Sequence, residues 1–249
     1  MDKKITGLKL FLLLFWQVSF AQQTILTDSN LPIMVISTDI DPATNSPIDI
    51  PDEPKVLATM QLIFRPDGAR NYLTDITNDS FLNYNGRIGI ELRGSSSQVL
   101  DKKPYGFTTL LEDNDSNNNV SLLEMPSEND WVLNSLAYDP SMIRDYLSYT
   151  LAANMGNYAP RVKYIEVIVN DDYKGVYILT EKIKRDSDRV NLKKIDDEDT
   201  DFPEVTGGYI VKADKTTGGD VVAWTMPNYG GWDTDFLHHY PKTEDITNE

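Results

Sequence analysis

The stretch K-Y-I-E-V-I-V-N-D-D-Y-K-G-V-Y-I-L-T, Lys163 to Thr180, contains two apolar segments around a short polar turn. Lys163–Val169 and Gly175–Thr180 are rich in β-branched and aromatic residues, which favour strands. The turn Asn170–Asp172 carries residue types that tolerate the backbone of a tight hairpin. This stretch therefore predicts a β-hairpin and, with it, an antiparallel sheet at the centre of the fold.

Further strands are expected on both sides of this hairpin. Apolar or alternating segments bounded by turn signals lie at residues 31–36, 56–64, 87–92, 105–111 and 208–213. One helix is expected from Ser141 to about Met155, with Asp139 or Ser141 as its cap and Gly156 at its end. Its large apolar side chains recur at helical spacing. The pattern predicts an α+β fold in which an antiparallel sheet carries a helix packed on one face.

Composition excludes several classes of partner. The chain has 249 residues, a formal net charge of −16 and no cysteine. A negatively charged surface repels nucleic-acid phosphates and anionic membranes, so neither is an expected partner. No segment after the N-terminus is apolar enough to span a membrane.

The N-terminus has the pattern of a secretion signal. Lys3, Lys4 and Lys9 precede the apolar segment 10–20, and Ser19-Phe20-Ala21 is a small-x-small cleavage site. We therefore predict a signal peptide at 1–21 and export by a bacterial secretory route to the cell surface or medium. A β-rich, loop-rich segment is expected at 22–83, and a main domain at 84–249.

A cluster of phosphate-binding residue types follows the strand 87–92. Arg93 offers a planar fork of donors, Gly94 allows close backbone approach, and three serines add hydroxyls. Lys102 and Lys103 follow shortly afterwards, and we expect one of them to point inward against the sheet. A turn of this composition is also common as a purely structural element, so these residues alone do not decide between the two interpretations.

Six short sequence blocks occur in a fixed order between Tyr84 and Asp214. They are Arg93-Gly-Ser-Ser, Lys102-Lys-Pro-Tyr-Gly-Phe, a helix opening Asp139-Pro-Ser, Tyr158-Ala-Pro-Arg, Asn170 to Ile183, and Gly207-Gly-Tyr-Ile-Val-Lys-Ala-Asp. This order resembles the kinase family of spore-coat protein H, the CotH family. The resemblance implies an atypical protein-kinase-like fold that uses ATP and Mg²⁺ to phosphorylate Ser or Thr of a secreted or cell-surface protein.

The resemblance also implies roles for individual residues. Arg93 and Lys103, or Lys102, would face the nucleotide phosphates, and the helix from Ser141 would be the small-lobe helix with Arg144 near the cleft. The hinge, whose backbone groups meet adenine, would be formed by Leu179, Thr180, Glu181 and Lys182. Thr180, Glu181 and Lys182 are therefore candidate nucleotide contacts, although Glu181-Lys182 is equally readable as a solvated pair at a strand end.

The later catalytic segments of the family are not recognisable. Kinase chemistry needs an Asp that orients the acceptor hydroxyl and an Asp or Asn that holds Mg²⁺. Trp232-Asp233-Thr234-Asp235-Phe236 resembles the family's metal-binding strand, but it lies too close to the hinge for that role to be transferred. Thr247 begins a pattern typical of a helix start. We therefore expect the front, small-lobe part of such a domain and assign no catalytic residue.

An independent motif has the spacing of a calcium loop. Asp113, Asp115, Asn117 and Glu124 stand at positions one, three, five and twelve, with Val120 in the apolar position. Asn118 replaces the usual glycine, and the flanks read as strand and loop. An Asx-rich hairpin turn is the alternative.

Two functions from different classes remain open at this point. The first is an exported, ATP-binding CotH-like kinase domain. The second is a non-catalytic surface or matrix module of the same fold, which would bind a protein or glycan through Trp224, Tyr229 and Trp232.

Overall fold

The computed structural model describes residues 25–242, except 197, 217–220 and 229, so the predicted signal peptide, Tyr229 and the helix start at Thr247 lie outside the described residues. The elements are β1 Asp28–Ser29, β2 Ile33–Thr38, β3 Ile40–Asp41, β4 Ser46–Pro47, β5 Val56–Ile63, β6 Asn71–Tyr72, η1 Leu73–Thr77, η2 Asp79–Phe81, β7 Leu82–Leu92, η3 Ser96–Val99, β8 Tyr105–Leu110, β9 Asp130–Asn134, α1 Arg144–Asn154, β10 Val162–Val169, β11 Asp172–Glu181, η4 Glu204–Thr206, β12 Ile210–Ala213, β13 Val222–Pro227 and β14 Asp233–Tyr240.

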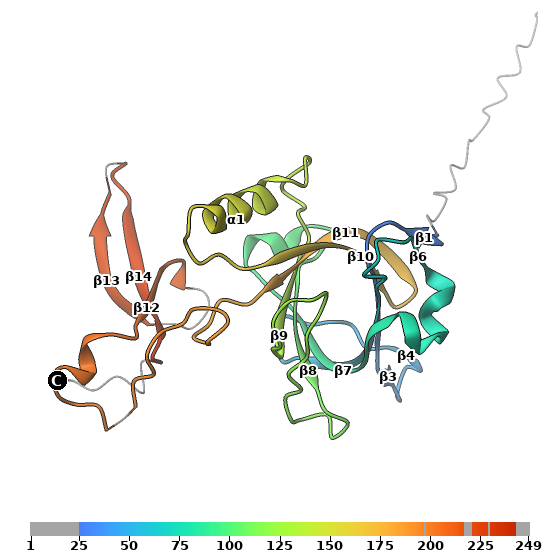
Figure 1. Ribbon diagram of the computed structural model, residues 1–249, viewed down its shortest axis with the longest axis horizontal. Helices are drawn as coiled ribbons and strands as arrows, with labels where there is room; N and C mark the ends of the chain where they lie inside the picture. The colour runs from blue at the N-terminus through green and yellow to red at the C-terminus, as the bar shows by residue number, and fades with distance from the viewer. Residues whose placement is uncertain (1–24, 197, 217–220, 229, 243–249) are drawn as a thin grey trace, which may run out of the picture.

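Seven strands close into a barrel in the order β10-β11-β9-β8-β7-β5-β2 (Figure 1). Neighbours are antiparallel except at the closing seam, where β10 pairs with β2 in parallel. Asn170 secures this seam, because its Oδ1 accepts a hydrogen bond from the Thr38 backbone N–H at 2.9 Å. The closed barrel leaves none of these seven strands as a free sheet edge.

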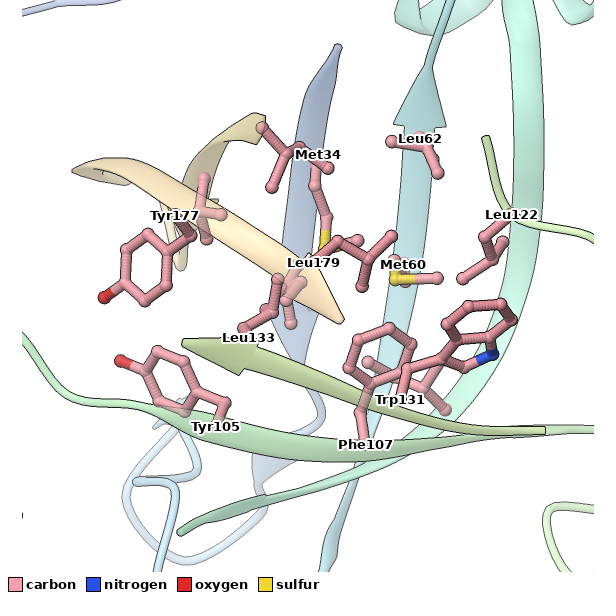
Figure 2. Packing of buried hydrophobic residues seen from close by; sticks show 14 of the residues in the cluster. Met34, Met60, Leu62, Tyr105, Phe107, Leu122, Trp131, Leu133, Tyr177 and Leu179 are labelled. Carbon is pink, nitrogen blue, oxygen red and sulfur yellow. The ribbon is translucent and has the colours of Figure 1, made fainter. Parts of the chain in front are cut away.

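The barrel interior is the hydrophobic core. Figure 2 shows side chains from opposite walls meeting in it, including Met34, Met60, Phe107, Trp131 and Leu179. Phe107 and Trp131 are each 1% exposed. Alternation along each strand places one set of side chains inside, and burial of these large apolar groups is the main stabilising contribution to the barrel.

The central hairpin is confirmed. β10 and β11 pair along their length around a turn in which Asn170 and Asp171 have φ of 50° and 61°. Two consecutive positive φ values match the twist that a short hairpin requires, and Asn and Asp tolerate them. The strands expected at 56–64, 87–92, 105–111 and 208–213 are also present as β5, β7, β8 and β12, with ends displaced by a few residues.

The predicted packing of the helix is wrong. α1 begins at Arg144 rather than Ser141 and buries none of its residues. Its apolar stripe is exposed, comprising Met142, Ile143, Tyr146, Leu147, Leu151 and Met155. The physical reason is that the sheet closes on itself and fills its interior with its own side chains, so the helix can only lie against the outer surface of the barrel, where Tyr146 stacks on Tyr164 with ring centres 5.1 Å apart. The mixed content of mostly strand with one helix agrees with the expected α+β class.

The expected boundary at residue 84 falls inside the barrel. β2 and β5 precede it and β7 to β11 follow it, yet all belong to one closed sheet. The segment 22–83 therefore contributes to the same core as the main domain.

A second, three-stranded sheet has the order β12-β14-β13 and stands apart from the barrel (Figure 1). Its register contains a bulge: Ile210 pairs with Tyr240 and Val211 with His238, which makes His239 the extra residue on β14. Bulges re-aim side chains and recur next to functional sites. Among the described residues no helix is long and apolar enough to cross a membrane.

Candidate functional site

A cavity of about 490 Å³ lies where the end of β11, the helix α1 and the second sheet meet. Its walls include Asn134 of β9, Tyr149 of α1 and the segment Thr180–Ile183 that leaves the barrel. The second sheet contributes Ile210, Lys212, Asp214 and His239, and the remaining lining residues are Arg93, Val132, Pro160 and Lys242. The cavity therefore joins the barrel to the sheet that follows it.

The charge of this cavity is opposite to that of the chain. Four lining residues are cationic, Arg93, Lys182, Lys212 and Lys242, against the two carboxylates Glu181 and Asp214. The whole chain has 39 acidic and 23 basic residues. A concentration of positive charge in an acidic protein focuses anionic ligands into a cleft.

Glu181 is already engaged within the protein. Its side chain is fully buried and accepts hydrogen bonds from the backbone N–H and the guanidinium of Arg161, both at 2.8 Å. A buried carboxylate requires such compensation. Glu181 therefore fixes the end of β11 and offers little free charge to a ligand.

Arg189 is a buried residue that binds the backbone of Lys182, which forms part of the cavity wall. Its guanidinium is 1% exposed and donates to the Lys182 carbonyl at 2.6 Å and to the Asp130 carbonyl at 3.2 Å. The Glu128 and Glu181 carboxylates lie 3.9 Å and 4.0 Å from its Nε, and its Cζ lies 5.4 Å from the centre of the Trp131 ring. This one side chain joins β9, the end of β11 and the loop beyond it.

Asp130 belongs to the same charge network. Burial disfavours its ionised form, but the charge of Lys182, a hydrogen bond from Thr108 and the charges of Lys184 and Lys55 outweigh burial and lower its pKa. Lys184 also contacts Glu128 at 2.6 Å. The network therefore favours the ionised form of Asp130.

Replacing Asp130 with Asn is expected to reduce the loss of folding stability that occurs as the pH falls. A lowered folded-state pKa contributes stability that is present above the unfolded value of 3.8 and is lost as pH falls through the folded value. Denaturant unfolding of both proteins from about pH 7 to about pH 3 should show a difference that shrinks with acidity. A difference that stays constant with pH would contradict the assignment.

Arg93 lines this cavity and a second one of about 450 Å³. Its guanidinium makes no hydrogen bond or ion pair within the described residues. The second cavity is also lined by Gly94, Ser97, Asp139 and Arg144. Gly94 has φ of +89°, and a Cβ there would lie 2.3 Å from Ser97 Oγ, so glycine lets this turn close tightly. The prediction of an anion-facing Arg93 fits its placement.

Arg144 stands at the start of α1 and is largely exposed. Its Nε lies 3.6 Å from Asp139 Oδ1, while Asp139 accepts hydrogen bonds from the Arg144 and Ser141 backbone N–H groups at 2.9 and 3.1 Å. Asp139 therefore binds the backbone of the segment that leads into the helix, whereas the N-cap position is occupied by Ile143, which makes no side-chain capping hydrogen bond. The pKa of Asp139 is lowered, first by the hydrogen bond from the Ser141 hydroxyl at 2.6 Å and then by the backbone hydrogen bonds and the charge of Arg144.

The structure does not bring Lys102 or Lys103 to either cavity. Lys102 Nζ donates to the Val176 carbonyl at 2.5 Å and lies 4.7 Å from the centre of the Tyr177 ring. Burial lowers its pKa. Lys103 Nζ donates to the Gln98 carbonyl at 2.6 Å. Both residues precede β8, so strand alternation does not direct them, and both hold the protein's own carbonyl groups.

The residues of the predicted calcium loop are not gathered around one point. Asp113 Oδ1 accepts from the Asp115 and Ser116 backbone N–H groups at 3.0 and 2.9 Å, which is an Asx turn. Asn117 bridges to Leu110, and Glu124 is exposed with φ of 65°. Within the described part of the chain, no three His, Cys, Asp or Glu side chains form a group that could hold a metal ion. The calcium loop stays a prediction without geometric support.

Sequence reasoning singled out Arg93, Thr180, Glu181 and Lys182, and all four line one cavity. It missed His239, Tyr149, Lys212, Lys242 and the buried Arg189. Lys212 lies in the family block Gly207–Asp214, but no role was assigned to it. His239 reaches the cavity from a bulge, and no local pattern in the sequence predicts a bulge there.

Comparison with known proteins identifies one family. A family model described as CotH kinase protein matches residues 90–243. This range includes both cavities and the second sheet. A comparison with curated proteins gave no match.

Proposed function

This chain belongs to the CotH kinase protein family, and on that premise we propose that its 490 Å³ cavity binds a nucleoside triphosphate, ATP in the family's chemistry. The domain would then be a protein-kinase-related domain whose barrel and second sheet enclose the nucleotide between them. The segment Thr180–Ile183 takes the place of the hinge.

The observation that carries this proposal is the reversal of charge at the cavity. Four Lys or Arg side chains line a space that also has apolar walls, Val132, Ile183 and Ile210. A triphosphate needs the first feature, and a flat base needs the second. Arg93 has a guanidinium fork with no partner of its own within the described residues, which suits bidentate contact with a phosphate.

The residues present fit ATP better than they fit its metal. Arg93 and Lys182 would neutralise phosphate charge, and Tyr149 would border the base or ribose. The Mg²⁺ that the family uses would supply further charge neutralisation at the phosphates. Of the two described carboxylates that line the cavity, however, Glu181 is buried in an ion pair with Arg161, and Asp214 lies 3.4 Å from Lys212 Nζ. We therefore assign no metal ligand and no catalytic residue.

The finer features of the function are part of the proposal. The predicted signal peptide supports export, and an exported kinase-related domain would act on Ser or Thr of secreted or surface proteins. The acceptor is a protein rather than a nucleic acid, because the net charge of −16 repels phosphate backbones.

Replacing Arg93 with Ala is expected to raise the Kd for ATP by about 10- to 100-fold, the contribution of one charge-assisted contact of about 1.5–3 kcal/mol. Isothermal titration in the presence of Mg²⁺ measures this directly. Lys102→Met is the matched control, because it removes a nearby cation that lies outside the cavity. Equal losses in the two variants, or none in Arg93→Ala, would reject the assignment.

A second function is favoured by one specific observation. Trp232 is 77% exposed, and Trp224 is 44% exposed while stacked on Phe236 at 5.1 Å. Exposed aromatic rings on a sheet are typical of recognition surfaces. If the protein shows no thermal stabilisation by ATP, the non-catalytic binding module becomes the better proposal. Trp232→Ala would then be expected to abolish capture of the partner.

A further inference from the structure

Three consecutive backbone carbonyls follow the end of β11, and each already accepts a hydrogen bond. The Lys182 carbonyl accepts from Arg189 at 2.6 Å, and the Lys184 carbonyl accepts from the Val190 N–H at 3.3 Å. The Ile183 carbonyl accepts from His239 Nε2 at 3.1 Å. If this segment takes the place of the hinge, as proposed above, its backbone carbonyls are the acceptors available to a base that carries an amine.

Only the middle carbonyl is engaged by a residue of the cavity itself. Ile183 and His239 both line the cavity, whereas Arg189 and Val190 bind their carbonyls from outside its lining. Through this contact, His239 of the second sheet covers the middle one of the three carbonyl groups in the segment 182–184.

The chemistry of this contact is fixed by its acceptor. A carbonyl oxygen can only accept, so His239 must carry its proton on Nε2 to make the hydrogen bond. Its Nδ1 is enclosed and has no partner within the described residues, so it is not a substitute acceptor for a ligand in the cavity. The bulge on β14 makes His239 the extra residue of the ladder and allows its ring to reach across to Ile183.

Adenine and hypoxanthine differ in the substituent at position 6, which is the group that would hydrogen-bond to this carbonyl. Adenine carries an exocyclic amine, a donor, where a 6-keto purine carries a carbonyl, an acceptor. A site with an unengaged acceptor discriminates in favour of the amine, whereas a carbonyl that already accepts one hydrogen bond is a weaker acceptor for a second and discriminates less. We propose that His239 is a specificity-determining residue: by engaging the Ile183 carbonyl, it makes the cavity bind purine triphosphates with little regard to the 6-amino group.

This inference rests on the proposed nucleotide function, and it is tested by comparing ATP with inosine 5′-triphosphate. The wild-type protein is expected to bind both within about threefold, because the phosphate contacts are common to them. His239→Phe keeps a ring of similar shape but removes the donor, which frees the carbonyl. It is expected to favour ATP by about tenfold, the contribution of one hydrogen bond.

Two further variants separate specificity from folding. His239→Gln retains an N–H donor and should keep the two affinities close to equal. His238→Ala removes the adjacent histidine, which is not among the cavity's lining residues, and should behave as the wild type. Thermal melting of each variant shows that it is folded.

The outcomes are distinguishable. A wild-type preference for ATP of more than about tenfold overturns the inference while leaving the nucleotide function intact. An unchanged ratio in a folded His239→Phe does the same. Absence of binding by ATP, inosine triphosphate and inorganic tripolyphosphate overturns both the inference and the proposed function.

Discussion

Replacing Arg189 with Met is expected to lower the free energy of unfolding by about 3–5 kcal/mol, which is the usual result of breaking a buried ion pair from one side. The guanidinium is 1% exposed and lies between the carboxylates of Glu128 and Glu181, which are themselves buried. Its loss leaves two acidic groups with less compensation and frees the Lys182 and Asp130 carbonyls. Denaturant unfolding monitored by circular dichroism measures the change.

Two controls sharpen this prediction. Arg189→Lys retains the charge but not the planar fork, so an intermediate loss is expected. Lys194→Met removes an exposed cation paired with Asp196 and should leave the unfolding midpoint unchanged. If Arg189→Met unfolds at the same denaturant concentration as the wild type, the network described around it does not stabilise the barrel.

Replacing Gly208 with Ala is expected to displace the second sheet and weaken nucleotide binding by tenfold or more, about 1.4 kcal/mol or above. Gly208 has φ of +83°, which alone costs an alanine about 1–2 kcal/mol. A Cβ at this position would also lie 2.3 Å from the backbone carbonyl oxygen of Lys193. Since a backbone atom cannot swing aside, β12 must move, and with it Ile210 and Lys212 of the cavity.

The neighbouring glycine supplies the control. Gly207 is extended, with φ of −160°, and a Cβ there would meet no atom within 4 Å. Gly207→Ala should therefore bind ATP as the wild type does. Hydrogen exchange should accelerate in β12–β14 of the Gly208 variant and stay unchanged in the barrel. Uniform acceleration across the barrel would show that the two sheets unfold as one unit.

The individual strands and the hairpin of this fold can be predicted from the sequence, whereas the closure of the barrel cannot. The hairpin at Lys163–Thr180 is specified by adjacent residues, and the structure confirms it. The parallel seam between β10 and β2 depends on residues far apart in the chain, so periodicity cannot predict it. The apolar stripe of α1 was expected to be buried, but it is exposed. The spacing of apolar residues shows that a helix is amphipathic, and it does not show that another surface covers the apolar face.

The candidate site likewise contains residues that the sequence predicts and residues that it does not. Arg93 and the segment 180–182 could be found because short blocks of a known family carry them. His239 and Arg189 could not, since their importance arises from a bulge and from a long-range buried contact. Lys102 and Lys103 were assigned from their charge and from the family block that contains them, and their actual partners are backbone carbonyls of neighbouring segments.

The parallel seam also determines when the protein can fold. β2 is made early and pairs with β5 soon afterwards, but its other edge waits for β10, whose residues are synthesised much later. Contacts between distant parts of a chain slow folding, because the long intervening loop must close before they form. Until then β2 presents an open strand edge that can pair with other chains. A polypeptide cut to the family-matched range would lack β2 and β5 altogether and would leave the barrel open at two edges.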